Sequence, residues 1–315
     1  MRRIVLAGGS GQIGSLLRRH FLEAGDQVVV LTRRADAGPG FVHWNGRTIG
    51  DWARELEGID LLLNLCGRSV NCRYNASNRA EILASRIEPT RILGEAMTRV
   101  KSPPRVWMNA STATIYRHSF DKEMDEETGE IGGNEPDAPE KWRFSIEVAT
   151  RWEETFAAAV VPDTRKIVLR SAVTMSPDKG GIFAVLMRLV RFGLGGTQGD
   201  GRQFVSWIHE DDFVSAVEFL LAHDGMDGVV NLASPCPLPN RDFMYALRAA
   251  AGVAVGIPAT RTMLELGAAV IQTETELVLK SRRVVPRRLL AEGFRFRFPE
   301  WTAAANSLVR LLAEH

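Results

Sequence analysis

The sequence predicts an α/β fold, in which a Rossmann-type doubly wound parallel sheet is joined to a smaller, mostly helical C-terminal substrate domain. Short apolar runs alternate with amphipathic helical segments through the first 170 residues, which is the pattern of successive strand–helix–strand units. The first of these runs ends in a glycine-rich turn, AGGSGQIG, that opens a helix. From Pro235 onward the pattern is mostly helical.

Seven apolar runs bounded by turn residues are predicted as the strands of the sheet. Runs rich in Val, Ile and Leu are typical of parallel strands that are buried on both faces. They cover residues 2–9, 26–34, 41–44, 59–67, 104–111, 164–173 and 228–234. A further short strand is expected within residues 204–213, leading into a helix whose N-cap would be Asp211 or Asp212.

The helices between the strands are predicted from the spacing of apolar residues. Ile13, Leu16, Leu17 and Phe21 recur at helical spacing, and Gly25 follows them as a stop signal. Further helices are expected around Trp52 and Leu56, over residues 76–99, and over residues 143–159, where Phe144, Val148, Trp152 and Phe156 form one stripe.

Two charged segments do not fit the alternation of predicted strands and helices. Residues 121–140 are acidic, rich in glycine and proline, and without periodicity. We interpret them as a solvated loop, with a mobile lid over the site as the alternative. Near the C-terminus, the basic stretch KSRRVVPRR (residues 280–288) is interpreted as a solvated helix face.

Length and turn signals suggest how the chain divides. A chain of 315 residues allows about two domains at ~150 residues each. We assign residues 1–170, with residues 205–234 returning to them, to a dinucleotide-binding Rossmann domain. Residues 171–204 and 235–315 are assigned to a substrate-binding C-terminal module.

Composition excludes several classes of partner. The formal net charge of +1 gives no bulk attraction to nucleic acid or to an anionic membrane, and no apolar run approaches the ~20 residues that span a bilayer. The three cysteines form no CxxC pair and the six histidines form no HxH or HExxH motif, so no metal site is expected. We expect a cytoplasmic protein that is a monomer or a homodimer and acts on an unknown small molecule.

The glycine-rich turn has the context of a dinucleotide-binding loop, because it follows a strand and opens a helix. One glycine allows the tight turn, one lets the backbone approach a pyrophosphate, and one lets helix and strand pack closely. The N–H groups at the start of the helix would bind the phosphates. The residues concerned are Gly8, Gly9, Ser10, Gly11, Gln12, Ile13 and Gly14.

The end of the second strand indicates which dinucleotide is bound. Enzymes that prefer NAD usually place an acidic residue there, to accept a hydrogen bond from the ribose 2′-hydroxyl. This chain has Thr32, Arg33 and Arg34 instead, and no carboxylate before Asp36. Because a guanidinium group suits a 2′-phosphate, we expect NADP(H) as the cofactor. The alternative is that both arginines are simply solvated.

Several segments together resemble the extended short-chain dehydrogenase/reductase group, also called the NAD-dependent epimerase/dehydratase family. The resemblance covers nearly the whole chain and looks like that of one atypical branch, labelled only "epimerase family protein", which appends a small C-terminal module. The segments that carry it are GGSGQIG, NLCGRSV, EILASRIEPTRIL, LRSAVTMSPDKGG, GLGGTQGDGRQFVSWIHEDD and RRVVPRRLLAEGFRF.

The resemblance implies roles for residues outside the glycine loop. Leu65, Cys66 and Gly67 would line the adenosine–pyrophosphate groove. Glu81 and Arg86, the latter in place of an asparagine of typical members, would face the cofactor from the long helix. Val173, Thr174 and Pro177 are expected to approach the nicotinamide. Ser111 and Thr112 are the candidates for a catalytic hydroxyl.

The chain departs from the family at its acid–base pair. Typical members carry Tyr-x-x-x-Lys on the helix after the acidic loop, where the lysine lowers the pKa of the tyrosine. When the helix WRFSIEVATRWEE is registered on its Trp-Glu pair, Ser145 takes the tyrosine position and Ala149 the lysine position. No Tyr-x-x-x-Lys occurs anywhere in the sequence.

Other residues are therefore weighed as proton donors or substrate contacts. Tyr116 could lie near the site, although packing is its usual role. His209 has an ordinary pKa suited to proton transfer, or it could be a structural histidine bonded to backbone. Arg202 would bind an anionic substrate or form a surface ion pair, and Trp207 would form a pocket wall or core.

Two functions remain open from the sequence. One is an NADP(H)-dependent oxidoreductase or epimerase that acts on an unidentified small molecule through unconventional acid–base groups. The other is a non-catalytic NADP(H)-binding redox sensor or regulatory protein. The glycine loop and the arginines fit both, the missing Tyr/Lys pair favours the second, and the hydroxyls of Ser111 and Thr112 favour the first.

Overall fold

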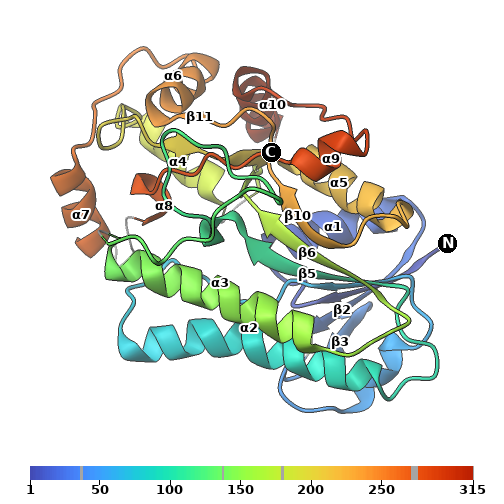
Figure 1. The fold of residues 1–315 in the computed structure, drawn as a ribbon. Helices are drawn as coiled ribbons and strands as arrows, with labels where there is room; N and C mark the ends of the chain where they lie inside the picture. Colours follow the sequence, from blue (N-terminus) through green and yellow to red (C-terminus); the bar gives the residue numbers. More distant parts are fainter. Residues whose placement is uncertain (36–37, 137, 179–180, 271–275, 315) are drawn as a thin grey trace.

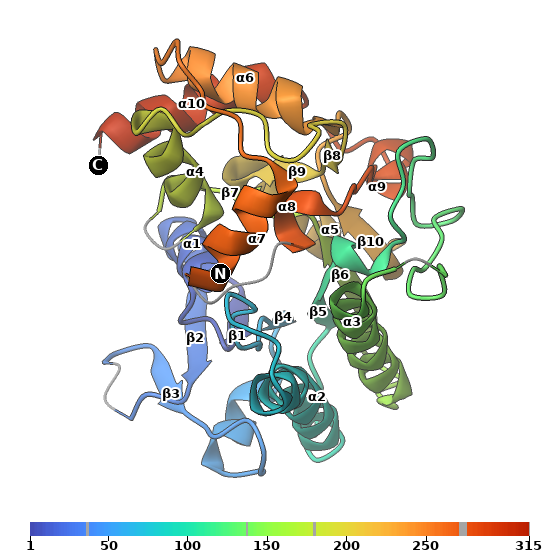
Figure 2. The same ribbon diagram turned by 90° about the vertical axis from the view of Figure 1, so that its left-hand side faces the viewer.

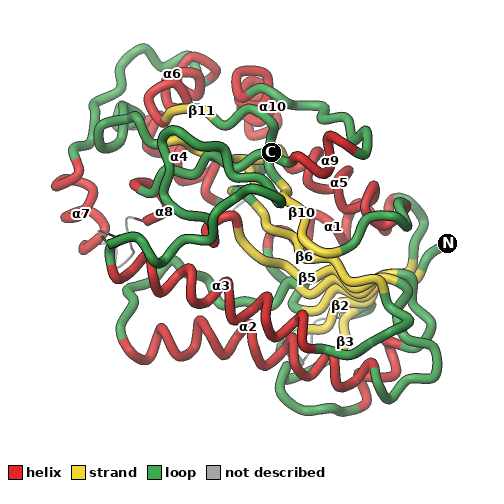
Figure 3. Tube along the Cα trace, in the orientation of Figure 1, coloured by secondary structure: helices red, strands yellow, loops and turns green. Residues whose placement is uncertain are grey.

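A parallel sheet of seven strands forms the centre of the computed structural model, which describes residues 1–35, 38–136, 138–178, 181–270 and 276–314 (Figures 1 and 3). The strand order is β10-β6-β5-β4-β1-β2-β3, and each neighbouring pair is parallel. This confirms the predicted fold class. The strands are β1 (Arg3–Ala7), β2 (Gln27–Thr32), β3 (Phe41–His43), β4 (Leu61–Asn64), β5 (Val106–Thr112), β6 (Arg165–Ser171) and β10 (Gly228–Leu232).

Helices cover both faces of the sheet, because successive strand residues face opposite ways. Ile4 and Leu6 of β1 pack with α1 (Gln12–Glu23), α5 (Glu210–Ala222) and α9 (Arg287–Ala291). Val5 and Ala7 face the other layer, which contains η1 (Asp51–Leu56), α2 (Ala76–Met97) and α3 (Glu140–Ala158). The last two lie side by side (Figure 1).

The strand predicted within residues 204–213 is two short strands, and neither joins the seven-stranded sheet. β8 (Phe204–Val205) pairs with β11 (Leu238–Pro239), and β9 (Trp207–His209) pairs with β7 (Val173–Met175). The predicted N-cap is also wrong. His209 caps α5, because its Nδ1 accepts from the Asp211 N–H at 3.1 Å. The Asp212 carboxylate instead accepts from the N–H groups of Arg297 and Phe298.

The second half of the chain builds a smaller, mostly helical layer beyond the sheet. α4 (Ile182–Arg191), α6 (Asn240–Ala250) and α10 (Trp301–Glu314) share one apolar core. Figure 2 shows α7 (Arg261–Val270) and α8 (Glu276–Leu279) in front of the carboxyl ends of the strands. The exact domain boundaries stay a prediction. Among the helices formed by the described residues, none is long and apolar enough to cross a membrane.

The basic stretch near the C-terminus is not a solvated helix face, which corrects our interpretation. Lys280, Ser281, Arg282 and Val284 are all buried and precede α9. We call residues 276–288 the tail segment. Its ion pairs reach the acidic loop: Arg283 with Glu123 at 3.0 Å and Arg287 with Asp125 at 2.9 Å. The two charged segments therefore neutralise each other, and the described part of the acidic loop is held against the tail.

We expect Trp301→Ala to destabilise the whole protein, because Trp301 anchors α10 on the body of the molecule. Its ring is 2% exposed, stacks on Phe243 at 4.0 Å, and its Nε1 donates to the Phe243 carbonyl. The loss in free energy of unfolding should be about 3–5 kcal/mol, measured by chemical denaturation. Tyr245→Ala on the exposed side of α6 is the matched control, with an effect within about 0.5 kcal/mol. Equal effects would contradict this anchoring.

Candidate functional site

Two adjoining cavities open at the carboxyl ends of the strands. One has a volume of about 440 Å³ and is bordered by the glycine-rich turn, by Leu169 and by residues 171–174. The other, of about 280 Å³, lies between α2 and α3. Leu65 and Ser111 border both. The cavities meet where strand order reverses between β1 and β4, which is the usual ligand site of a doubly wound sheet.

The glycine-rich turn leaves no room for side chains on its inner side. A Cβ on Gly14 would lie 2.2 Å from the Gly9 carbonyl oxygen, and one on Gly8, whose φ is +71°, would lie 2.7 Å from Cys66 Sγ. A Cβ on Gly11 would meet nothing within 4 Å. The turn is therefore packed tightly against the sheet and is open outward, as the close approach of a ligand to the backbone requires.

The start of α1 carries polar groups without protein partners. Gly11 is the N-cap, and no side chain caps the helix. Gln12 borders the larger cavity, and its Nε2 is buried with no hydrogen-bond partner in the described structure. First-turn N–H groups and a buried amide donor together suit an anion such as a phosphate.

Positive charge gathers at the end of β2. Thr32 is buried there, with its hydroxyl oxygen accepting from the Arg34 N–H at 3.3 Å, whereas the side chains of Arg33 and Arg34 are exposed. Arg33 lies close enough to Cys66 for its charge to oppose the rise in that thiol's pKa, which burial raises to about 12. Asp36 lies outside the described residues.

Most of the residues predicted to hold the cofactor border the two cavities, but some do not. Glu81 is exposed and pairs with Arg68 at 2.8 Å, because it lies on the solvent side of α2. Neither Glu81 nor Gly9, Ser10, Thr32, Arg33, Arg34 or Pro177 borders either of these two cavities. Those that do are Gly8, Gly11, Gln12, Ile13, Gly14, Leu65, Cys66, Gly67, Arg86, Val173 and Thr174.

Arg86 is the cation in the wall of the smaller cavity. Its guanidinium group lies over the Trp152 ring at 5.2 Å and donates to the carbonyl oxygens of Ile82 (2.9 Å) and Arg68 (3.2 Å). Burial lowers its pKa to about 10. Among the described residues no carboxylate pairs with it, so its charge is free to attract an anionic group in the cavity.

Two predicted hydroxyl groups border this cavity, and each already forms a hydrogen bond within the protein. Ser111 Oγ donates to Glu153 Oε1 at 2.5 Å, and Glu153 is held in turn by two hydrogen bonds from Arg170, of 2.9 and 2.7 Å. Thr112 Oγ1 accepts from the Thr114 N–H at 3.1 Å and caps η2 (Ala113–Ile115). A Ser111 whose proton points at a carboxylate can accept a hydrogen bond from a ligand.

The structure places four other predicted site residues away from both cavities. Tyr116 is buried, and its hydroxyl donates to Asn231 Oδ1 (2.9 Å) and accepts from Arg170 (3.1 Å). Trp207 packs edge-on against Trp301 in the core. Arg202 lies over the Phe120 ring at 5.6 Å. Structural contacts occupy these side chains.

His209, the fourth of these residues, is fully buried. Its ring stacks on Phe298 with centroids 4.0 Å apart, and its Nδ1 caps α5. Burial lowers its pKa to about 4, against the opposing charge of Asp211. The imidazole is therefore neutral at physiological pH, in line with the structural alternative that we weighed for it.

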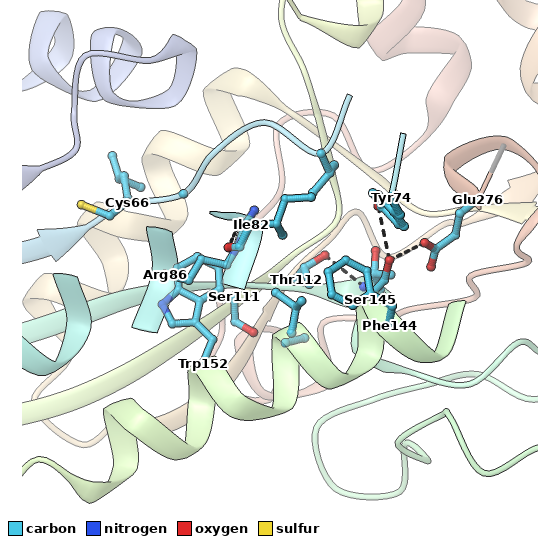
Figure 4. A pocket seen from close by; sticks show the side chains of 16 residues that line it. Cys66, Tyr74, Ile82, Arg86, Ser111, Thr112, Phe144, Ser145, Trp152 and Glu276 are labelled. Atoms are coloured by element: carbon cyan, nitrogen blue, oxygen red, sulfur yellow. Dashed lines mark hydrogen bonds between the residues drawn. The ribbon is translucent and has the colours of Figure 1, made fainter. Parts of the chain in front are cut away.

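Ser145 meets a carboxylate that the sequence did not reveal. Its Oγ lies 2.5 Å from Glu276 Oε2 and 3.4 Å from the Tyr74 hydroxyl (Figure 4). All three residues border the smaller cavity, at the end opposite Arg86 and Trp152. We missed Glu276 and Tyr74. The one available signal was the spacing of Glu276 and Lys280, which places a carboxylate and an amine on one face of a helical turn.

Two family models match this chain. Residues 4–233 match the model of the NAD dependent epimerase/dehydratase family. Residues 261–308 match a domain of unknown function, DUF1731. That second match contains α7, α8 and the tail segment.

Similar proteins align over nearly the full chain. Mouse epimerase family protein SDR39U1 is 33% identical over 313 residues, which is 98% of this chain and 99% of the relative. The crystal structure of human epimerase family protein SDR39U1 (isoform 2) with NADPH is 30% identical, with a TM-score of 0.85, and covers 98% and 99% of the two chains. A nucleoside-diphosphate sugar epimerase from Corynebacterium glutamicum is 26% identical, with a TM-score of 0.77, over 98% of this chain and 58% of that one.

The buried His209 should make the protein lose stability in mild acid. Unfolded histidine takes up a proton near pH 6.5, whereas folded His209 does so near pH 4, so acid favours the unfolded chain between these values. The full loss is about 3 kcal/mol, measured by denaturant unfolding from pH 7 to pH 4. His209→Asn, which keeps an N-cap oxygen, should flatten this dependence. An unchanged slope in the variant would refute this expectation.

Proposed function

The chain belongs to the NAD-dependent epimerase/dehydratase family, and we propose that it binds NADP(H) and works as an oxidoreductase or epimerase on a small molecule. The observation that carries the proposal is the junction of the two cavities at Ser111 and Leu65. One cavity has the cradle that a dinucleotide needs. The other has a cation at one end and hydroxyl and carboxyl groups at the opposite end.

The residues of the larger cavity fit the cofactor. The Gly8–Gly14 turn is open where a pyrophosphate would lie, and the unpartnered Nε2 of Gln12 supplies a donor beside it. Arg33 and Arg34 offer guanidinium groups, without an acidic residue before Asp36, to a 2′-phosphate. The NADPH in the crystal structure of the human relative, at 30% identity, supports this assignment.

In this proposal the residues of the two cavities have the following roles. The bound dinucleotide supplies hydride chemistry. The turn and α1 hold its phosphates, and Val173 and Thr174 shape the far end of the larger cavity. Arg86 draws an anionic group of the substrate into the smaller cavity, or stabilises negative charge that develops on a substrate oxygen. Ser111 orients the substrate by accepting a hydrogen bond, and Tyr74, Phe144 and Trp152 exclude water.

A non-catalytic NADP(H)-binding sensor is the second candidate. It is favoured by the lack of a Tyr-x-x-x-Lys pair in the sequence and by the engagement of Ser111 with Glu153. Single-turnover assays separate the two functions. An enzyme loaded with NADPH oxidises it when aldehydes, ketones or 2-oxo acids are added, whereas a sensor binds NADPH and leaves it reduced under the same conditions.

We expect Arg33→Ala to weaken NADPH binding about 10- to 100-fold, because it removes charge-assisted hydrogen bonds to the 2′-phosphate. NADH lacks that phosphate, so its affinity should stay within about twofold. Isothermal titration calorimetry measures both. Arg54→Ala on η1, an exposed arginine outside the site, is the matched control and should leave both affinities unchanged. Equal weakening of NADPH and NADH binding would refute the assignment of Arg33.

A further inference from the structure

The position that a tyrosine occupies in typical family members is coupled here to the C-terminal domain. Ser145 stands at that position on α3, and Glu276 reaches it from α8, 131 residues further along the chain. Figure 4 shows the carboxyl group of Glu276 directed at Ser145 across the end of the smaller cavity. The helix that lacks the Tyr-x-x-x-Lys pair is thus contacted at Ser145 by an ionisable group from a different part of the fold.

The carboxyl group of Glu276 is not fully satisfied by the protein. Its side chain is 3% exposed, Oε2 is bonded to Ser145, and Oε1 is buried with no hydrogen-bond partner in the described structure. A buried carboxylate with one unpaired oxygen is costly. The cost is smaller for a neutral carboxyl group whose proton lies on Oε2, between Oε2 and Ser145 Oγ, and for a carboxylate whose Oε1 faces a ligand donor. Because Glu276 borders the cavity, either state makes it available to a bound molecule.

The charges around Glu276 come from the tail segment and from α3. Lys280 Nζ lies 3.9 Å and Arg282 Nη2 lies 4.0 Å from Oε1, and the charge of Lys141 on α3 also acts on the carboxyl group. These cations lower the pKa of Glu276, but burial outweighs them and raises it above the ordinary value. Lys280 also donates to the Thr114 carbonyl at 2.7 Å, and burial lowers its pKa to about 8. The cations can therefore stabilise a carboxylate once it forms.

We propose that Glu276 is the proton source of this site and that Ser145 passes its proton to the substrate oxygen, an inference that rests on the proposed reductase function. As the substrate carbonyl carbon receives a hydride from the reduced cofactor, the C=O π bond breaks and its electron pair moves to oxygen. In the reactive state the Glu276 proton is on Oε2 and is donated to Ser145 Oγ, so that the Ser145 hydroxyl points at the substrate instead of donating to Oε2 as it does when Glu276 is a carboxylate. The substrate oxygen takes the Ser145 hydroxyl proton, and Ser145 takes the proton from Glu276 Oε2. Glu276 is left as a carboxylate and is reprotonated from solvent. Oxidation follows the same path in reverse.

The relay explains how a serine hydroxyl can donate a proton near neutral pH. An isolated serine hydroxyl is a poor acid near neutral pH, because the alkoxide that it leaves is too basic. In the relay the hydroxyl gains one proton as it gives up another, so no alkoxide forms. Ser145 is the catalytic residue, and Glu276 acts through it.

The test compares Glu276→Gln and Ser145→Ala with Glu147→Gln, an exposed residue of α3. NADPH oxidation is followed with a panel of aldehydes, ketones and 2-oxo acids across pH. Wild-type kcat should fall as pH rises through the pKa of Glu276. Both site variants should lower kcat about 100-fold and lose that alkaline limb, with KM within about threefold, because the lost step is proton transfer. Glu147→Gln should match the wild type.

Infrared difference spectra give a readout that needs no turnover. The carbonyl band of a protonated carboxyl group at neutral pH should be present in the wild type, absent in Glu276→Gln and shifted in Ser145→Ala. A band that is unchanged in Glu276→Gln overturns the inference, as does full kcat with an unchanged pH profile in that variant. A wild type that binds NADPH but oxidises it with no member of the panel overturns the reductase function and the relay together. If Glu276→Gln does not fold, Ser145→Ala alone decides by the same criteria.

Discussion

The packing of the tail segment (residues 276–288) against the loop after β5 is the interaction on which the smaller cavity depends. Lys280 donates to the Thr114 carbonyl, and the Ser281 hydroxyl donates to the Ser119 carbonyl. The Arg282 carbonyl accepts from Ser206 Oγ at 2.6 Å, and Arg287 pairs with Asp125. Polar residues can be buried this deeply only because nearly every group finds such a partner. The segment is thereby fixed in register, and Glu276 at its start is fixed with it.

This constraint makes the C-terminal domain part of the site. The Rossmann half can build the cradle for a dinucleotide by itself, since glycine turn, α1 and β2 are neighbours in sequence and in space. It cannot close the smaller cavity. α3 presents Ser145, and the carboxyl group that contacts it, Glu276, arrives with the tail segment together with Lys280. The apolar core around Trp301 in turn holds α10, which follows that segment, against α6.

What the sequence predicted well is local. The seven strands and the glycine turn follow from apolar runs and turn residues within short windows, and the structure has them within a few residues. What it did not predict depends on contacts between distant segments. His209 displaces Asp212 as N-cap because Asp212 is used by Arg297 and Phe298, more than 80 residues away. The basic tail looked solvated because the acidic loop that neutralises it lies about 160 residues earlier. Arg86 was found only through the family resemblance.

In the register that the resemblance implies, Ser145 and Ala149 take the tyrosine and lysine positions, and the charged groups of the site then come from other elements. In typical members, as the resemblance implies, one helix carries both the acid and the cation that tunes it. Here the cation in the cavity wall, Arg86, belongs to α2, and the acid beside Ser145 belongs to α8. A guanidinium group without a carboxylate favours an anionic substrate at one end, and a buried carboxyl group favours proton exchange at the other. Because Arg86 and Glu276 lie at opposite ends of the cavity, they do not neutralise each other. Arg86 can therefore act as a cation toward a ligand, and Glu276 keeps its raised pKa.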